Sequence, residues 1–174
     1  MRRLLLLRHA KTERAEPGER DSDRKLMARG RTDAAVIGAY MNRHRLVPDL
    51  ALVSPVTRAE ETWAGVVTAF SKTPPAVKDD RIYNASAETL IDVIGATRDA
   101  RTLLVVGHNP GLQDLALHLI ASGNVEARER ISEKLPTSGL VVVEFPFNDW
   151  SRLRPNSGRL ERFVSPRLIA EATD

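Results

Sequence analysis

The stretch Leu4-Leu5-Leu6-Leu7-Arg8-His9 decides the fold class. Four consecutive leucines predict a strand that is buried on both faces, and such strands belong to parallel sheets covered by helices. A second apolar run, from Thr102 to Val106, leads into Gly107-His108-Asn109-Pro110. Both strands lead into side chains that can bind a ligand or take part in catalysis. The sequence therefore predicts an α/β domain with polar groups gathered at one edge of its sheet.

Short apolar runs alternate with longer amphipathic stretches along the chain, which predicts a three-layer α/β/α sandwich with a mostly parallel central sheet. Further strands are expected at residues 50–53, 76–83, 139–147 and 159–164. Helices are expected at residues 26–43, 54–70, 88–97, 112–121 and 126–134. Ser54 and Asn109 are expected to cap two of these helices, each followed by a proline in the first turn. No repeat or linker interrupts the pattern, so we expect residues 1–174 to form one domain.

The composition excludes several classes of protein. Of the 174 residues, 42% are apolar and 28% are charged, values typical of a globular domain. The chain has no cysteine, which excludes disulfides, iron–sulfur clusters and a thiol nucleophile. Four scattered histidines without a metal-binding motif predict neither a metal site nor a cofactor. The net charge is only +3 and acids are interleaved with bases, so we expect no nucleic-acid partner.

We expect no targeting signal in the N-terminal residues. Met1-Arg2-Arg3 precedes an apolar run of four leucines, whereas the core of a signal peptide needs about 7–15 apolar residues. No stretch approaches the roughly 20 apolar residues of a membrane span. We therefore expect a cytoplasmic protein with no membrane partner.

Three of the predicted strands end in groups suited to phosphate chemistry. Arg8-His9, the segment from Ser54 to Arg58, and His108 each follow a strand, and the carboxyl ends of parallel strands meet at one edge. A guanidinium group can fork onto two phosphate oxygens, and a neutral imidazole can accept a phosphoryl group. The sequence therefore predicts His9 as nucleophile, Arg8 and Arg58 as phosphate-binding groups, and His108 as a second donor.

Each of these residues also has an ordinary explanation. Arg8-His9 fits a polar strand end, His108 fits a loop histidine, and Arg58 fits an ion pair within its own helix. The convergence of all of them at one edge favours the catalytic interpretation over the separate structural ones.

Three motifs resemble those of the histidine phosphatase (phosphoglycerate mutase-like) superfamily. Leu7-Arg8-His9-Ala10 is similar to its RHG/RHA signature. Ser54-Pro55-Val56-Thr57-Arg58-Ala59-Glu60-Glu61-Thr62 resembles its S-P-x-x-R-A-x-x-T block, and Val106-Gly107-His108-Asn109-Pro110 resembles its late G-H block. The three blocks occur in the family's order, and the resemblance covers about residues 3 to 147.

The chain is most similar to the short bacterial phosphohistidine phosphatases of the SixA type, through Asp21-Ser22-Asp23-Arg24-Lys25-Leu26, Tyr83-Asn84-Ala85 and Lys134-Leu135-Pro136-Thr137. This resemblance implies that His9 accepts the phosphoryl group. It implies that Arg8, Arg58 and His108 complete the phosphate pocket, and that Arg24 reaches the substrate phosphate. The implied partner is a phosphohistidine-bearing protein, such as a phosphorelay or phosphotransfer domain.

The resemblance is incomplete at the general acid. Larger members place a glutamate after the third strand or an aspartate beside the second histidine, but here Asn109 follows His108. Glu88 is the nearest acid after Tyr83 and is our candidate, although its place near a helix start also suits the helix dipole. A weak acid matters less for a phosphoramidate, which favours phosphohistidine as substrate. A small sugar or nucleotide phosphate, and a non-catalytic phosphate-binding module, are the alternatives.

Overall fold

The sheet has the mostly parallel character that the leucine run predicts. The computed structural model describes residues 1–173, in which seven strands lie in the order β3-β2-β4-β1-β6-β7-β5. Within this part of the chain, β6 alone runs against its neighbours. The strands are β1 (Arg2–Arg8), β2 (Leu50–Val53), β3 (Ala76–Lys78), β4 (Thr102–Gly107), β5 (Ile120–Gly123), β6 (Leu140–Phe145) and β7 (Gly158–Val164).

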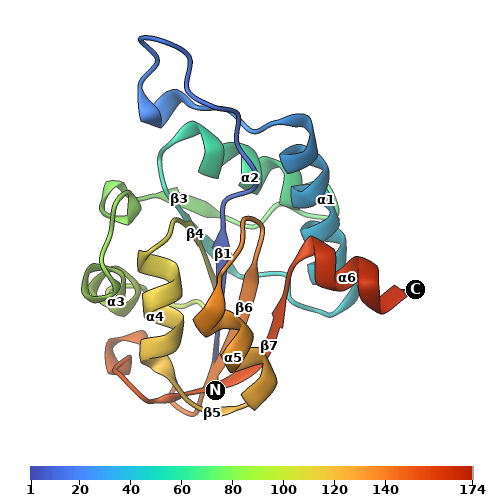
Figure 1. Cartoon of the computed structure of the whole chain (residues 1–174). Helices are drawn as coiled ribbons and strands as arrows, with labels where there is room; N and C mark the ends of the chain where they lie inside the picture. Colours follow the sequence, from blue (N-terminus) through green and yellow to red (C-terminus); the bar gives the residue numbers. More distant parts are fainter. Residues whose placement is uncertain (174) are drawn as a thin grey trace.

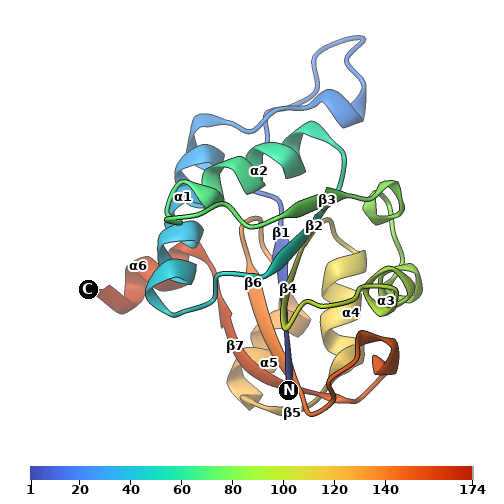
Figure 2. The same cartoon turned by 180° about the vertical axis from the view of Figure 1, so that it is seen from behind.

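Helices cover both faces of the sheet, as Figures 1 and 2 show from opposite sides. One face is covered by α1 (Ala28–Arg43), α2 (Thr57–Val67) and α6 (Pro166–Thr173). The other is covered by α3 (Ala87–Gly95), α4 (Gly111–Leu119) and α5 (Val125–Glu133). Short 3₁₀ helices lie at η1 (Asp21–Asp23), η2 (Asp80–Ile82) and η3 (Trp150–Arg152). The predicted three-layer α/β/α sandwich is confirmed.

The leucines of β1 explain why both layers of helices are needed. Leu4 and Leu6 belong to the core under α3 and α4, whereas Leu5 and Leu7 belong to the core under α1 and α2. All four are fully buried. Because successive side chains of a strand point to opposite faces, this strand is stable only with apolar cover on each side.

Two predicted helix caps are wrong, because tertiary hydrogen bonds use their side chains instead. The Ser54 Oγ bonds to His108, and α2 begins later, with Val56 as its N-cap and no side-chain capping bond. Asn109 donates from Nδ2 to the Leu135 carbonyl at 2.8 Å. Helix α4 begins at Gly111 after a cis Asn109–Pro110 bond.

Other boundaries differ where the local pattern is ambiguous. The predicted strand over residues 76–83 is the short β3 followed by η2, because the Asp79 side chain accepts from the Arg81 amide and turns the chain. The helix expected to reach residue 121 ends at Leu119, and Ile120–Gly123 becomes the edge strand β5 beside β7. Neither β5 nor α6 was predicted.

A long excursion of the chain lies over the carboxyl ends of the strands. It follows β1, contains η1 and leads into α1, and it projects beyond the sheet at the top of Figure 1. An isolated bridge between Thr12 and Leu26 ties its two arms together. Across the residues that the structure describes, every helix is too short or too polar to cross a bilayer.

Candidate active site

The three predicted strand ends meet at one edge because β2, β4 and β1 are neighbours in the sheet. The His9 amide donates to the Gly107 carbonyl at 3.0 Å, and the Ser54 amide donates to the Val106 carbonyl at 3.1 Å. These bonds hold the segments after all three strands in register. His9, Arg58 and His108 are 7%, 5% and 9% exposed, so the charged and titratable groups are embedded in protein.

The imidazole of His9 is held in the tautomer that a nucleophile needs. Its Nδ1 lies 2.8 Å from the Ala10 carbonyl, which can only accept, so Nδ1 carries the proton and Nε2 keeps its lone pair. Burial first, and then the positive charges of Arg8 and Arg58, lower the pKa of His9 to about 4 against the raising effect of that hydrogen bond. His9 is therefore neutral at physiological pH.

His108 lies beside His9 with its ring oriented by Ser54. The two ring centroids are 5.3 Å apart, and the His108 Nε2 lies 2.7 Å from the Ser54 Oγ. A hydroxyl that donates to Nε2 places the imidazole proton on Nδ1, where it can be donated to an oxyanion. Burial, and then the neighbouring His9, lower the pKa of His108 to about 3. With the Ser54 hydroxyl as the donor, His108 is neutral and carries its ring proton on Nδ1.

The two arginines are held in place by hydrogen bonds from their Nη atoms. Arg8 donates from Nη1 to the Leu135 carbonyl at 3.1 Å. Arg58 donates from Nη1 to the Asp21 carbonyl at 2.8 Å and from Nη2 to the Asp21 Oδ2 at 3.0 Å. The Nε of each is buried and has no hydrogen-bond partner within residues 1–173. Such an arrangement fixes both guanidinium groups before a ligand arrives.

Asp21 joins Arg58, Tyr83 and Arg24 into one cluster that the sequence did not predict. The Tyr83 hydroxyl donates to its Oδ2 at 2.5 Å, and the Arg24 Nε donates to its Oδ1 at 3.1 Å. The hydrogen bond from Tyr83, and then those from Arg58, lower the pKa of Asp21. Asp21 is therefore an ionised anchor for Arg58 and not a proton donor. The predicted residue Arg24 reaches the site region through this carboxylate.

Four buried donors without partners belong to residues at this edge of the sheet. Within residues 1–173, these atoms are the Nε of Arg8, the Nε of Arg58, the Nδ1 of His108 and the Oγ of Ser138. Ser138 belongs here because its amide donates to the carbonyls of Arg8 and His9, at 3.1 and 3.2 Å. Unpaired buried donors are costly, and an oxyanion beside them would satisfy several at once. The arrangement fits the non-bridging oxygens of a phosphoryl group.

Glu88, the predicted general acid, lies on the exposed first turn of α3. Ser86 caps this helix by accepting from the Thr89 amide at 3.1 Å. A glutamate in a first turn also stabilises the helix dipole. The role of Glu88 in proton transfer stays a prediction.

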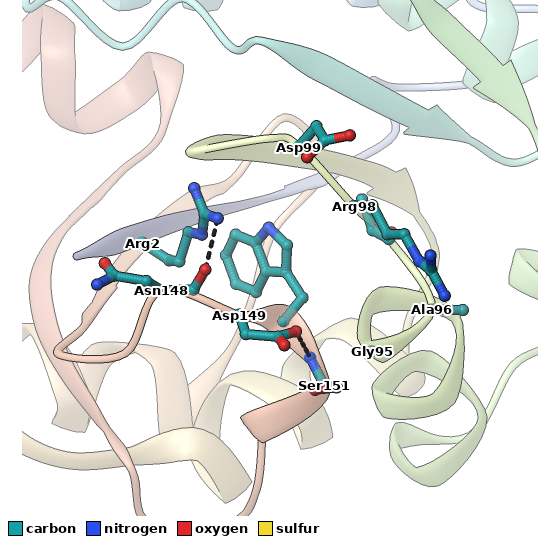
Figure 3. A pocket seen from close by; sticks show the side chains of 10 residues that line it. Arg2, Gly95, Ala96, Arg98, Asp99, Asn148, Asp149 and Ser151 are labelled. Atoms are coloured by element: carbon teal, nitrogen blue, oxygen red, sulfur yellow. Dashed lines mark hydrogen bonds between the residues drawn. The ribbon is translucent and has the colours of Figure 1, made fainter.

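A hollow of about 480 Å³ is lined by other residues (Figure 3). It is lined by residues from the start of β1, the end of α3 and the segment around Trp150. Its polar groups bond one another, since Arg2 donates to the Asn148 carbonyl and the Ser151 amide donates to Asp149. None of the predicted site residues lines it. Across residues 1–173, no group of three or more His, Asp or Glu side chains is placed to hold a metal ion.

We expect His9 to titrate with a midpoint near pH 4, where protonation would remove the Nε2 lone pair and stop nucleophilic attack. Between pH 6.5 and pH 5 the nucleophile should stay neutral, because burial opposes the charged form. A histidine NMR titration, with the His9 signal assigned by its loss in His9→Ala, measures this directly. A midpoint near the unperturbed value of about 6.5 would contradict the prediction.

Known proteins match this chain in sequence and in fold. The model of the histidine phosphatase superfamily (branch 1) matches residues 4–87. An uncharacterized protein of Mycobacterium tuberculosis is 37% identical over 164 residues, which are 92% of this chain and 100% of that protein. A crystal structure from Agrobacterium tumefaciens that bears the name phosphohistidine phosphatase SixA is 33% identical, with a TM-score of 0.81 and coverage of 95% of this chain and 98% of that one. A protein histidine phosphatase SixA complexed with tungstate, 20% identical, shares the fold with a TM-score of 0.75 over 96% of this chain and 99% of the other.

Proposed function

Since this chain belongs to the histidine phosphatase superfamily, we propose that it hydrolyses phosphohistidine on a protein through a covalent intermediate on His9. The observation that carries the proposal is the set of four unpartnered donors at the same edge of the sheet as a neutral imidazole whose Nε2 is available. The name of the 33% identical Agrobacterium tumefaciens structure supports phosphohistidine as the substrate class.

In the first step the His9 Nε2 attacks phosphorus, and the bond between phosphorus and the substrate imidazole breaks. The guanidinium groups of Arg8 and Arg58 and the Nδ1–H of His108 neutralise the non-bridging oxygens, which is most of what a protein supplies to phosphoryl transfer. The leaving imidazole nitrogen takes a proton from a solvent water as it departs, and the phosphoryl group is now on His9, which keeps its own proton on Nδ1.

In the second step a water oxygen attacks phosphorus, and the bond between phosphorus and the His9 Nε2 breaks. The water loses a proton to solvent, inorganic phosphate leaves, and His9 returns to its neutral form. Because the Ala10 carbonyl holds the proton on Nδ1 throughout, the same nitrogen serves as nucleophile and leaving group.

The acidic groups near the site are poorly placed to protonate a leaving group, which favours substrates whose leaving group departs readily. Asp21 is ionised, Asn109 stands where an aspartate would lie beside the second histidine, and Glu88 is on an exposed turn. An alkoxide departs slowly without a proton donor, whereas an imidazole that takes a proton from water departs readily. This supports a phosphoramidate over a sugar phosphate.

The test is phosphate release by the wild-type chain from three substrates: a histidine-phosphorylated phosphotransfer domain, p-nitrophenyl phosphate and glucose 6-phosphate. We expect rapid release from the phosphohistidine domain and little from the sugar phosphate. A preference for the sugar phosphate would overturn the proposal in favour of a small-molecule phosphatase. Phosphate-dependent binding of the domain without turnover would instead indicate a binding module.

If Glu88 is the general acid, Glu88→Gln should slow an alkyl phosphate by about a hundredfold, near the lower end of acid catalysis, and a phosphohistidine much less. The leaving alkoxide needs the proton, and the imidazole does not depend on Glu88 for it. Asp92→Asn is the matched control, since Asp92 is an exposed acid on the same helix. Equal effects on both substrates would leave Glu88 with its helix-dipole role alone.

A further inference from the structure

A groove of about 380 Å³ combines a cationic rim with an apolar floor. Its cations come from segments that are far apart in the sequence: Lys11, Arg29, Arg130, Lys134 and Arg167. Within the described residues, Asp33 is the single carboxylate that lines it. Among the lining residues, five cations against one acid give the groove an excess of positive charge.

The groove lies at the same edge of the sheet as His9. Lys11 is two residues beyond His9, and Lys134 precedes Leu135, whose carbonyl accepts from Arg8. The groove also lies at the end of β7, and the order β1-β6-β7 puts that end two strand spacings, about 10 Å, from the end of β1. A molecule that presents a phosphoryl group to His9 therefore has this groove within reach of its neighbouring parts.

The floor of the groove indicates what kind of anion fits. Phe163, Leu168, Pro136 and Pro166 line it and are partly exposed. A small anion would leave these apolar surfaces in water, whereas a polypeptide segment with an apolar side chain between acidic residues would cover them. The combination of rim and floor matches an acidic segment of a protein.

Two of the five cations, Lys11 and Lys134, are available to such a segment without losing another partner. Arg130 and Arg167, by contrast, each pair with a glutamate one turn along the same helix, at 3.0 Å. Lys11 and Lys134 have no carboxylate within 4 Å among residues 1–173. Both side chains are exposed, and they flank the segments that carry His9 and hold Arg8.

We infer that this groove docks an acidic, leucine-bearing segment of the substrate protein next to its phosphohistidine. The inference rests on the proposed function and adds to it the chemistry of the partner. Docking would increase kcat/KM for a protein or peptide that carries such a segment, and it would leave a small aryl phosphate unaffected. Exposed ion pairs are individually weak, so the two lysines together should contribute about tenfold.

The experiment uses two synthetic phosphohistidine peptides of equal length, one flanked by glutamate and leucine and the other by glutamine and leucine. We expect the wild-type chain to favour the acidic peptide by about tenfold in kcat/KM at low salt, and to lose much of this preference at high salt. In the Lys11→Glu/Lys134→Glu variant the preference should vanish or reverse. Its rate with the neutral peptide and with p-nitrophenyl phosphate should stay within about twofold of wild type at high salt, where the new carboxylates no longer repel the phosphoryl group.

The matched control is Arg43→Glu/Lys72→Glu, which makes the same change in net charge at exposed positions that do not line the groove. This variant should keep the preference for the acidic peptide. Loss of the preference in the control as well would mean that overall charge attracts the peptide, and the docking inference would be wrong. Equal wild-type rates for the two peptides would also overturn it.

Binding of the fluorescently labelled, unphosphorylated acidic peptide separates this inference from the proposed function. Weaker binding to Lys11→Glu/Lys134→Glu than to the control supports the groove even if phosphohistidine is not hydrolysed, an outcome that would sink the proposed function alone. Displacement of the peptide by a short RNA at equal charge, with equal binding to both variants, would indicate a general polyanion surface and overturn the inference.

Discussion

His9→Ala should leave less than about 1% of wild-type phosphate release, because it removes the atom to which phosphorus must bond. No other imidazole nitrogen of the site can replace the His9 Nε2 as the nucleophile. The Nε2 of His108 is engaged by Ser54 at 2.7 Å, and its Nδ1 is assigned to donation. Phosphate release is measured with the phosphotransfer domain, and the wild-type intermediate is trapped by rapid acid-free quenching and located by mass spectrometry.

The control for His9→Ala is His118→Ala, since His118 is an exposed histidine of α4 outside the site. It should retain wild-type turnover. Thermal unfolding separates catalysis from folding, because His9→Ala removes one hydrogen bond to Ala10 and little apolar contact. Residual turnover well above 1% in a folded variant, or a phosphoryl group trapped on another residue, would refute the assignment of the nucleophile.

The architecture was predictable because it depends on local patterns. Four leucines that must be buried on both faces require a covered parallel strand, and the same holds for the run that begins at Thr102. The convergence of His9, Arg58 and His108 then follows from the rule that strands of a parallel sheet end at one edge. Because β2, β4 and β1 are neighbours in the sheet, their three ends lie close together.

The partners that prepare these side chains were not predictable, because each comes from a distant loop. Asp21 reaches Arg58 across 37 positions of the sequence, and in the sequence it is one of several acids in a polar segment. Ser138 reaches the site through amide bonds to the carbonyls of Arg8 and His9, with a backbone φ of 60° that its sequence does not signal. Ser54 resembled a helix cap, and only the fold shows that its hydroxyl orients His108.

Arg58→Lys should lower kcat by about 10²–10³, although the positive charge is kept, because the loss concerns geometry and not net charge. The guanidinium can bond to Asp21 through both Nη atoms while its buried Nε stays available. An ammonium has a single nitrogen on a flexible chain. If it pairs with Asp21 it turns away from the phosphoryl group, and if it reaches the phosphoryl group it leaves Asp21 without that partner.

The measurement is kcat and KM with p-nitrophenyl phosphate and with the phosphotransfer domain, together with inhibition by vanadate, which resembles the five-coordinate phosphorus of the transition state. Because Arg58 should stabilise the transition state more than the substrate, vanadate affinity should fall in proportion to kcat/KM. Arg81→Lys is the control, since Arg81 is an exposed arginine that also pairs with an aspartate, Asp79, at 2.8 Å. A change of less than about threefold in kcat for Arg58→Lys would mean that charge alone suffices at this position, and that the anchoring by Asp21 has no catalytic consequence.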